Sequence, residues 1–199
     1  MKKTTTLLLG MLLGLNLLFA QSVRVVDKNQ NEKRKGFIGL SIGPSIPLGE
    51  FKDEGLANTG LNITLVNFGY MLSDNFGIAG SWYGGAHTVD ASSFGVSDGM
   101  WSYGGLMAGP LFSTPLNDKI DFDIKALIGY SIANLELEGY KVEGKGLAYD
   151  IGAGLRFNFS PKWAFLLNVD HLGSPSKGDY IDRKIGVINT TVGIAYRLK

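Results

Sequence analysis

The sequence predicts an all-β fold, an eight-stranded antiparallel up-and-down transmembrane β-barrel with short periplasmic turns and longer extracellular loops. Three observations support this prediction. The chain starts with a pattern typical of export, its apolar and polar residues alternate along segments longer than soluble strands, and short turns alternate with long polar connections. Alternation over such lengths requires a different environment on each face of the sheet.

Composition limits the possible function classes. The 199 residues suffice for one domain of ordinary size, and a net charge of +1 argues against a nucleic-acid partner. The chain has no cysteine, which excludes disulfides, thiolate metal sites and thiol nucleophiles. We expect neither a cofactor nor a bound metal.

Residues 1–20 have the pattern of a signal peptide. Lys2 and Lys3 precede the short apolar segment 7–19, and Ala20 stands before a polar run. The alternative is a membrane anchor, but a spanning helix needs about 20 apolar residues, and this stretch is shorter and interrupted. We therefore expect export with cleavage after Ala20.

The mature chain divides into two parts. Residues 21–35 are polar and have the composition of a flexible segment, which we place in the periplasm. Residues 36–199 form the barrel domain, with no second domain after it.

The clearest strands are 119–135 and 146–159. In the first, Asp121, Asp123 and Lys125 alternate with apolar residues, so one face is apolar and the other begins with three charges. Soluble strands average about 5 to 6 residues, whereas a tilted strand that crosses a membrane needs about 9 to 11. Strand length therefore favours a bilayer around the apolar face and a polar lumen behind the other.

The remaining segments follow the same alternation. The eight predicted strands are residues 36–46, 59–72, 76–88, 99–112, 119–135, 146–159, 163–171 and 185–198. Short turn signals follow the second, fourth and sixth strands, and longer polar stretches lie between the others, at residues 49–58, 89–98, 136–145 and 172–184. An even strand number returns both ends to the short-turn side.

The lumen-facing charges are predicted to form a paired network. Its members are Asp121, Asp123, Lys125, Asp150, Arg156, Asp170 and Arg197. Eight strands leave an interior just wide enough for side chains, and open porins need about 16 to 18 strands. An unpaired buried charge costs several kcal/mol. These charges should therefore fill the lumen together with space-making glycines, rather than line a channel.

Aromatic residues cluster beside the predicted short turns and the chain end, as an interfacial girdle requires. They are Phe76, Phe112, Phe122, Phe157, Phe159, Trp163, Phe165 and Tyr196. A soluble sandwich or barrel, in which these rings form an ordinary core, is the competing interpretation.

The last strand, "TVGIAYRL", carries a further pattern. Thr191, Gly193, Tyr196 and Leu198 resemble the C-terminal signal read by the outer-membrane assembly machinery. With "GLSIGPSIPLGEF", "GPLFSTPLNDKIDFDIKALIGYS" and "GAGLRFNFSPKW", residues 36–199 resemble the porin-like outer-membrane β-barrel domain family of Gram-negative bacteria. The resemblance implies an outer-membrane barrel whose partners are membrane lipid, the assembly machinery and periplasmic chaperones. Members are structural, adhesive or secretion-associated, or have no known role.

A catalytic site is not expected. His87 and His171 lie near the loop ends of the third and seventh predicted strands, too far apart around the ring to share a metal. Asp170, His171 and Ser174 could suggest a hydrolytic set, but adjacent strand residues face opposite sides. We interpret the histidines as interface polarity.

The resulting hypothesis is a monomeric barrel with a structural or surface-interaction role through its extracellular loops. The sequence does not identify the extracellular partner. Two alternatives remain at this stage: an exported soluble lipocalin-like barrel that binds a small apolar ligand in an apolar interior, and an outer-membrane lipid-modifying enzyme.

Overall fold

The computed structural model describes residues 35–54, 56–89, 99–137, 140–177 and 182–198, which belong to one compact unit. The predicted signal peptide at residues 1–20, and the predicted flexible segment 21–35 except for Lys35, lie outside the described residues.

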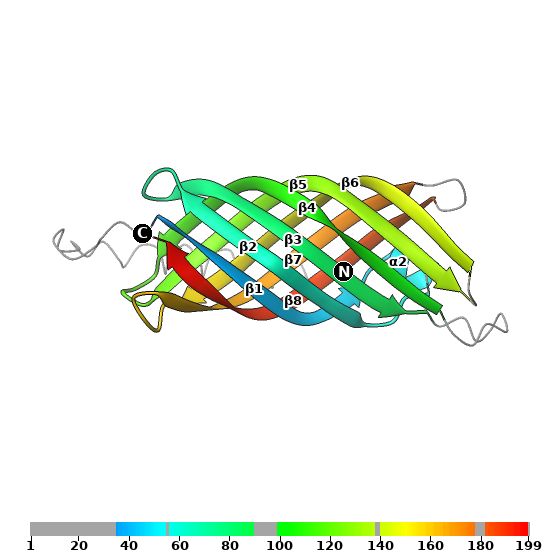
Figure 1. Cartoon of the computed structure of the whole chain (residues 1–199), viewed down its shortest axis with the longest axis horizontal. Helices are drawn as coiled ribbons and strands as arrows, with labels where there is room; N and C mark the ends of the chain where they lie inside the picture. The colour runs from blue at the N-terminus through cyan, green and yellow to red at the C-terminus, as the bar shows by residue number, and fades with distance from the viewer. Residues whose placement is uncertain (1–34, 55, 90–98, 138–139, 178–181, 199) are drawn as a thin grey trace, which may run out of the picture. The chain divides into compact units, whose positions relative to one another are not determined.

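Eight antiparallel strands close into a barrel in chain order, and β1 pairs with β8 (Figure 1). The strands are β1 (Gly36–Pro47), β2 (Gly60–Met71), β3 (Phe76–Thr88), β4 (Gly99–Pro115), β5 (Ile120–Leu137), β6 (Tyr140–Phe157), β7 (Trp163–Lys177) and β8 (Asp182–Leu198). The predicted fold class is confirmed. The three short turns lie at the left end of the barrel in Figure 1, beside the start of β1 and the end of β8.

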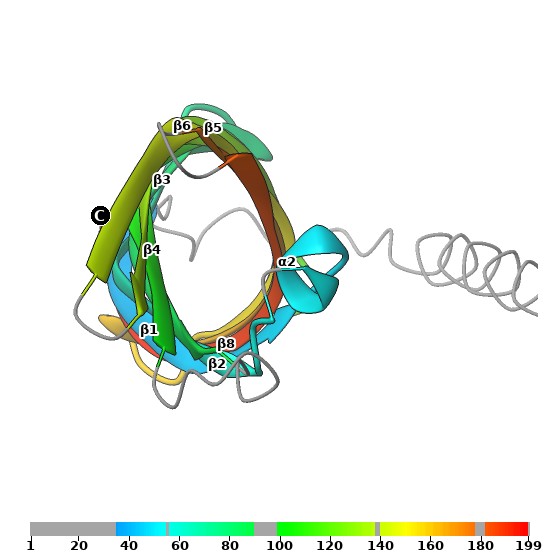
Figure 2. The same cartoon turned by 90° about the vertical axis from the view of Figure 1, so that its right-hand side faces the viewer.

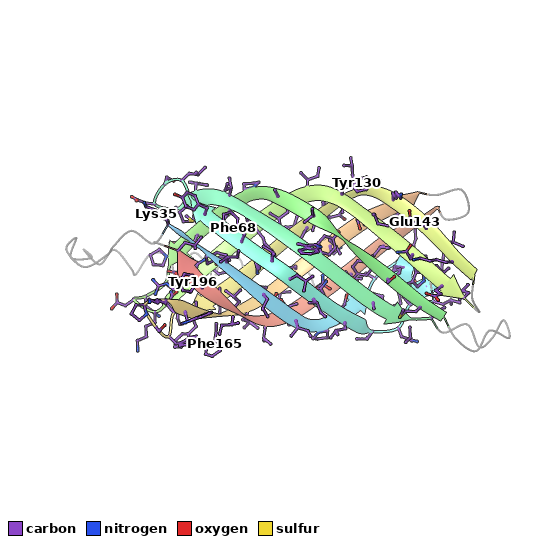
Figure 3. All side chains as sticks on the ribbon, in the orientation of Figure 1. Lys35, Phe68, Tyr130, Glu143, Phe165 and Tyr196 are labelled. Carbon is purple, nitrogen blue, oxygen red and sulfur yellow. The ribbon has the colours of Figure 1, made fainter. Side chains whose placement is uncertain are left out.

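Within the band of exposed apolar residues, the strands turn large apolar side chains outward and their charged side chains inward, where apolar residues such as Phe37 and Leu111 are also buried. On β6, Leu147 and Ile151 are 65% and 57% exposed, while Asp150 and Arg156 are 6% and 8% exposed. Figure 3 shows the side chains that project from the outside of the wall. A soluble lipocalin-like barrel requires a polar exterior in contact with water, so that alternative is wrong for these strands.

A β-bulge keeps the faces of β2 in phase. The register of β2 shifts between Thr64 and Val66, opposite the shift in β1 between Gly39 and Ser41. The extra residue lets Leu65 and Val66 both lie outside, while Thr64 and Asn67 are buried in the lumen. Without the bulge, every residue beyond it would change faces.

Two of the predicted long loops are wrong in large part, because the strands continue through them. β5 and β6 are each 18 residues long and pair across the predicted loop 136–145, with Glu136 opposite Lys141. Likewise, β7 and β8 extend into the predicted loop 172–184. Opposite charges that face each other across two strands stabilise the ladder, so the polar residues Glu136 and Lys141 belong to a strand pair and not to a loop.

A short helix, α2 (Glu50–Asp53), lies in the predicted loop 49–58 and was not predicted. One turn is too short to show a helical period. Figure 2 views the barrel from its loop end and shows α2 beside β8, where Leu48 N donates to Gly186 O at 2.8 Å. No helix in the described part of the chain has the length and apolar character needed to span a membrane.

Outward aromatic rings form a belt at the short-turn end, where Figure 3 labels Phe165 and Tyr196. Their ring centroids lie 4.4 Å apart for Phe159 and Phe165, and 5.4 Å apart for Trp163 and Tyr196. Along β6, the apolar face from Leu147 to the belt projects to about 25 Å on the barrel axis, given a rise of about 3.3 Å per residue and a tilt of about 40°. This height matches the hydrocarbon layer of an outer membrane.

The outward face of β6 provides a depth-dependent test. Ile151→Arg, at the middle of the apolar face, should lower the free energy of unfolding in lipid vesicles by about 2–4 kcal/mol. Leu147→Arg, at the outer edge, should lower it by at most about 1 kcal/mol. Denaturant titration followed by tryptophan fluorescence measures both. Equal effects would contradict the placement of the bilayer.

Candidate functional site

Two groups of side chains fill the lumen. The charge network comprises Asp121, Asp123, Lys125, Asp150, Arg156 and Asp170. The mouth cluster comprises Phe51, His87, Trp101 and Tyr103 at the loop end. Both come from residues that strand alternation directs inward, except Phe51, which comes from α2.

Arg156 on β6 occupies the centre of one ionic group. Its Nη2 and Nη1 atoms lie 3.3 Å and 3.1 Å from carboxylate oxygens of Asp121 and Asp123. The same Nη2 donates to Ser113 Oγ at 3.1 Å, and the guanidinium carbon lies 4.4 Å from the centroid of the Phe37 ring. One side chain therefore contacts residues from β1, β4 and β5.

Lys125 on β5 forms the second ionic group. Its Nζ lies 3.1 Å from Asp170 on β7 and 3.7 Å from Asp150 on β6. Gly152, the register partner of both Lys125 and Asp170, has no side chain in the space that the Asp170 carboxylate occupies. A glycine at this position lets the lysine reach across one strand to the next.

The structure thus brings six of the seven predicted lumen charges into two groups, each with one cation and two carboxylates. Arg197, the seventh, lies near the end of β8. Its Nη1 donates to Ser160 O at 2.9 Å, in the turn between β6 and β7. This contact ties the final strand to a short turn.

Little empty space remains among these charges. A cavity of about 20 Å³ lies between the two ionic groups, bordered by Phe37, Asn67, Asp123 and Lys125 among others. Such a volume holds about one water molecule. Between the two ionic groups, the described side chains therefore leave room for little more than this water.

The mouth cluster was missed by the sequence analysis. The Phe51 ring is fully buried and makes edge contacts with His87, Trp101 and Tyr103, at centroid distances of 5.1, 5.6 and 6.4 Å. Trp101 and Tyr103 both face inward on β4, and strand alternation alone could have predicted this. Their partner Phe51, in a predicted loop, could not be predicted in this way.

His87 lies inside the lumen and is 1% exposed, so its interpretation as interface polarity is wrong. It shares the inward phase of Ala79 and Tyr83 on β3. Its Nδ1 lies 2.7 Å from Asn58 O, and its Nε2 lies 3.3 Å from the Tyr103 hydroxyl. These contacts satisfy both ring nitrogens.

His171 and Ser174 lie on opposite faces of β7. Ser174 and Asp170 are buried, whereas the His171 ring contacts outward Tyr149 at a centroid distance of 5.7 Å. Two side chains separated by an odd number of positions on a regular strand point to opposite faces of the sheet. Among the described residues, no three His, Cys, Asp or Glu side chains are grouped to hold a metal ion.

The residues of the predicted assembly signal occupy both faces of β8. Thr191 is buried in the lumen, Gly193 packs closely against the Leu40 carbonyl of β1, and Tyr196 is exposed in the aromatic belt. Leu198 O accepts a hydrogen bond from Lys35 N at 3.2 Å. These positions close the barrel seam, and the role in assembly stays a prediction.

Comparison with known proteins identifies related sequences and folds. The family model described as outer membrane protein beta-barrel domain matches residues 10–197. The solved structure of Neisserial surface protein A has a TM-score of 0.61 at 8% identity, with 82% of this chain and 97% of that chain covered. Ail of Yersinia pestis, in complex with a heparin analogue, has a TM-score of 0.51 at 21% identity, with 82% and 99% covered. At such low identities, the structural similarity shows a shared fold alone. No curated protein matches the chain.

The Arg156 group should contribute to stability more than a surface ion pair does. Arg156→Ala would leave buried carboxylates without their cation, lowering the free energy of unfolding by about 3–5 kcal/mol. The control is Lys145→Ala, because Lys145 is 52% exposed and pairs only with similarly exposed Glu143 among the contacts described, at 2.8 Å. That change should leave the free energy of unfolding nearly unchanged, because an ion pair between solvent-exposed side chains contributes little to stability. Equal melting of the two variants in detergent would contradict a stabilising network.

Gly152 offers a second test of the same network. Gly152→Ala would push the Asp170 carboxylate away from Lys125 and lower the free energy of unfolding by about 1–3 kcal/mol. Gly84→Ala is the matched control, because a Cβ there would meet Tyr103 O at an ordinary 3.6 Å. Denaturant unfolding should show a loss only for Gly152→Ala.

Proposed function

Because the chain belongs to the outer membrane protein beta-barrel domain family, we propose that it is a closed, non-catalytic barrel that makes contacts at the cell surface. Membership of this family supports a location in the outer membrane. The proposed surface role rests on one observation, the extension of β5 and β6 beyond the bilayer.

The β5–β6 hairpin is far longer than a crossing requires. Each strand has 18 residues, whereas a membrane-spanning strand needs about 9 to 11. Beyond Leu147 the outward face of β6 changes from apolar to charged, with Lys145, Glu143 and Lys141 all exposed. Figure 3 labels Glu143 near the loop end of the barrel. A paired ladder holds these charges in fixed positions above the membrane, which suits recognition of a polar partner.

The packed lumen supports a contact role over transport. Two ionic groups occupy its inner half, and the mouth cluster packs together in its outer half. The opposed faces of His171 and Ser174 support the absence of hydrolytic catalysis on β7.

The partners follow from this placement. We propose that the apolar outer face contacts membrane lipid and that Thr191, Gly193, Tyr196 and Leu198 are read by the assembly machinery after delivery by periplasmic chaperones. The finished barrel acts as a monomer. Its extracellular partner binds the charged hairpin.

Charge reversal on the hairpin tests this proposal. Lys141→Glu combined with Lys145→Glu should reduce, by at least severalfold, the adhesion of protein-expressing cells to protein-coated surfaces or to each other. The control is Lys162→Glu, also an exposed lysine but in the turn at the opposite end of the barrel. It should leave adhesion unchanged.

The adhesion assay requires equal amounts of folded barrel, checked by migration on gels with and without heating. Unchanged adhesion of the hairpin variant would contradict its contact role. Steady ion conductance of the purified wild-type barrel in planar bilayers would contradict the closed lumen.

A further inference from the structure

The outer half of the lumen differs chemically from the inner half. Beyond the charge network, the wall presents buried apolar side chains from β4 to β8. They are Trp101, Ala133, Ala148, Leu172, Ile185 and Val187, all at most 2% exposed. Together with buried polar residues of the same half, among them Ser45, Ser131 and Ser174, this lining forms a mainly apolar compartment below the barrel mouth.

The side chain that fills part of this compartment does not belong to the wall. Phe51 is the buried residue of α2, while Glu50, Lys52 and Asp53 are exposed. The Phe51 ring meets three aromatic rings edge-on, a geometry that favours another aromatic group over an aliphatic one. The compartment therefore contains a subsite shaped for one aromatic ring.

The mouth cluster also has a polar edge. The Tyr103 hydroxyl lies 3.1 Å from Ser45 Oγ and 3.3 Å from His87 Nε2. The other His87 nitrogen, Nδ1, contacts Asn58 O. Asn58 N in turn donates a hydrogen bond to Thr88 O of β3 at 2.9 Å. A hydroxyl or ring N–H on an aromatic molecule could join this chain of hydrogen bonds.

The segment that carries Phe51 is bonded to strands at its two ends, and between them the buried side chains of Phe51 and Ala57 hold it to the barrel. Leu48 and Asn58 bond to β8 and β3, whereas α2 between them is a single turn without a side-chain N-cap. Such a short helix has no stability of its own. Gly49 and Leu56 flank it with φ angles of 51°, in the left-handed region where chain direction changes sharply. On the barrel rim, Glu50 contacts exposed Lys184 at 3.6 Å, a surface pair of small energetic value.

We propose that α2 is a movable lid and that Phe51 occupies a binding subsite for a small, uncharged aromatic molecule with one hydrogen-bonding group, of the phenol or indole class. The ligand enters from outside the cell, displaces Phe51, and packs its ring against Trp101 and Tyr103. This ligand site goes beyond the surface-contact function and does not depend on the charged outward residues of the β5–β6 hairpin.

The absence of cysteine from the chain allows a specific test. Glu50→Cys combined with Lys184→Cys places two exposed thiols where the surface ion pair now joins lid and rim. A short thiol-to-thiol cross-linker locks the lid, and the same variant with each thiol capped by N-ethylmaleimide is the control. The probe is 4-fluorophenol, whose binding to the full-length barrel in detergent is followed by fluorine NMR.

We expect saturable binding to the capped protein and at least tenfold weaker binding to the cross-linked protein. Phe51→Ala, which removes the competing ring, should bind the probe at least tenfold more tightly than wild type. Equal affinity of the capped and cross-linked forms, or no saturable binding to the capped form, would overturn the proposal. If Phe51→Ala fails the heat-modifiability check for folding, the cross-linked pair decides alone.

Discussion

The rest of the structure depends on the narrow interior that eight closed strands enclose. Every large inward side chain must be accommodated by a small one beside it. The register meets this constraint by placing a bulky residue next to an inward glycine on the neighbouring strand. The pairs are Phe37 with Gly69, Tyr103 with Gly85, Met107 with Gly129, Asn168 with Gly154, and Asp170 with Gly152. The high glycine content follows from this packing rather than from flexible loops.

The same narrowness explains why the charges connect several strands. Because the Asp170 carboxylate occupies the space above Gly152, Lys125 can bind carboxylates from two other strands at once. Arg156 extends further and reaches Phe37 of β1 across the lumen. These contacts add lateral cross-links to a backbone ladder that joins only neighbouring strands. A wider barrel would fill with water between the charges and weaken each contact.

The sequence predicted which face of a strand each residue occupies, because that depends on local alternation. It did not predict contacts that form only when the barrel closes. The inward position of Asp150 and the outward position of Ile151 follow from strand period alone, as does the opposition of Asp170 and His171. The hairpin beyond Leu147 was mistaken for a loop because its outward residues face water, and strand and loop polarity look alike there. Phe51 could not be placed, since its ring partners on β3 and β4 come near only when the barrel closes around them.

The two halves of the lumen carry different constraints. In the part of the barrel that the hydrocarbon layer surrounds, a charge can be buried only beside a charge of opposite sign. The stability of the barrel therefore depends on Arg156 and Lys125. Near the mouth, buried apolar side chains line much of the interior, and Phe51 enters it from α2, which is not part of the strand ladder. Substitutions in the inner half therefore act on stability first. Those at α2 and at the exposed outward positions of the β5–β6 extension lie away from the ionic groups, so variation in function can accumulate there with less effect on the fold.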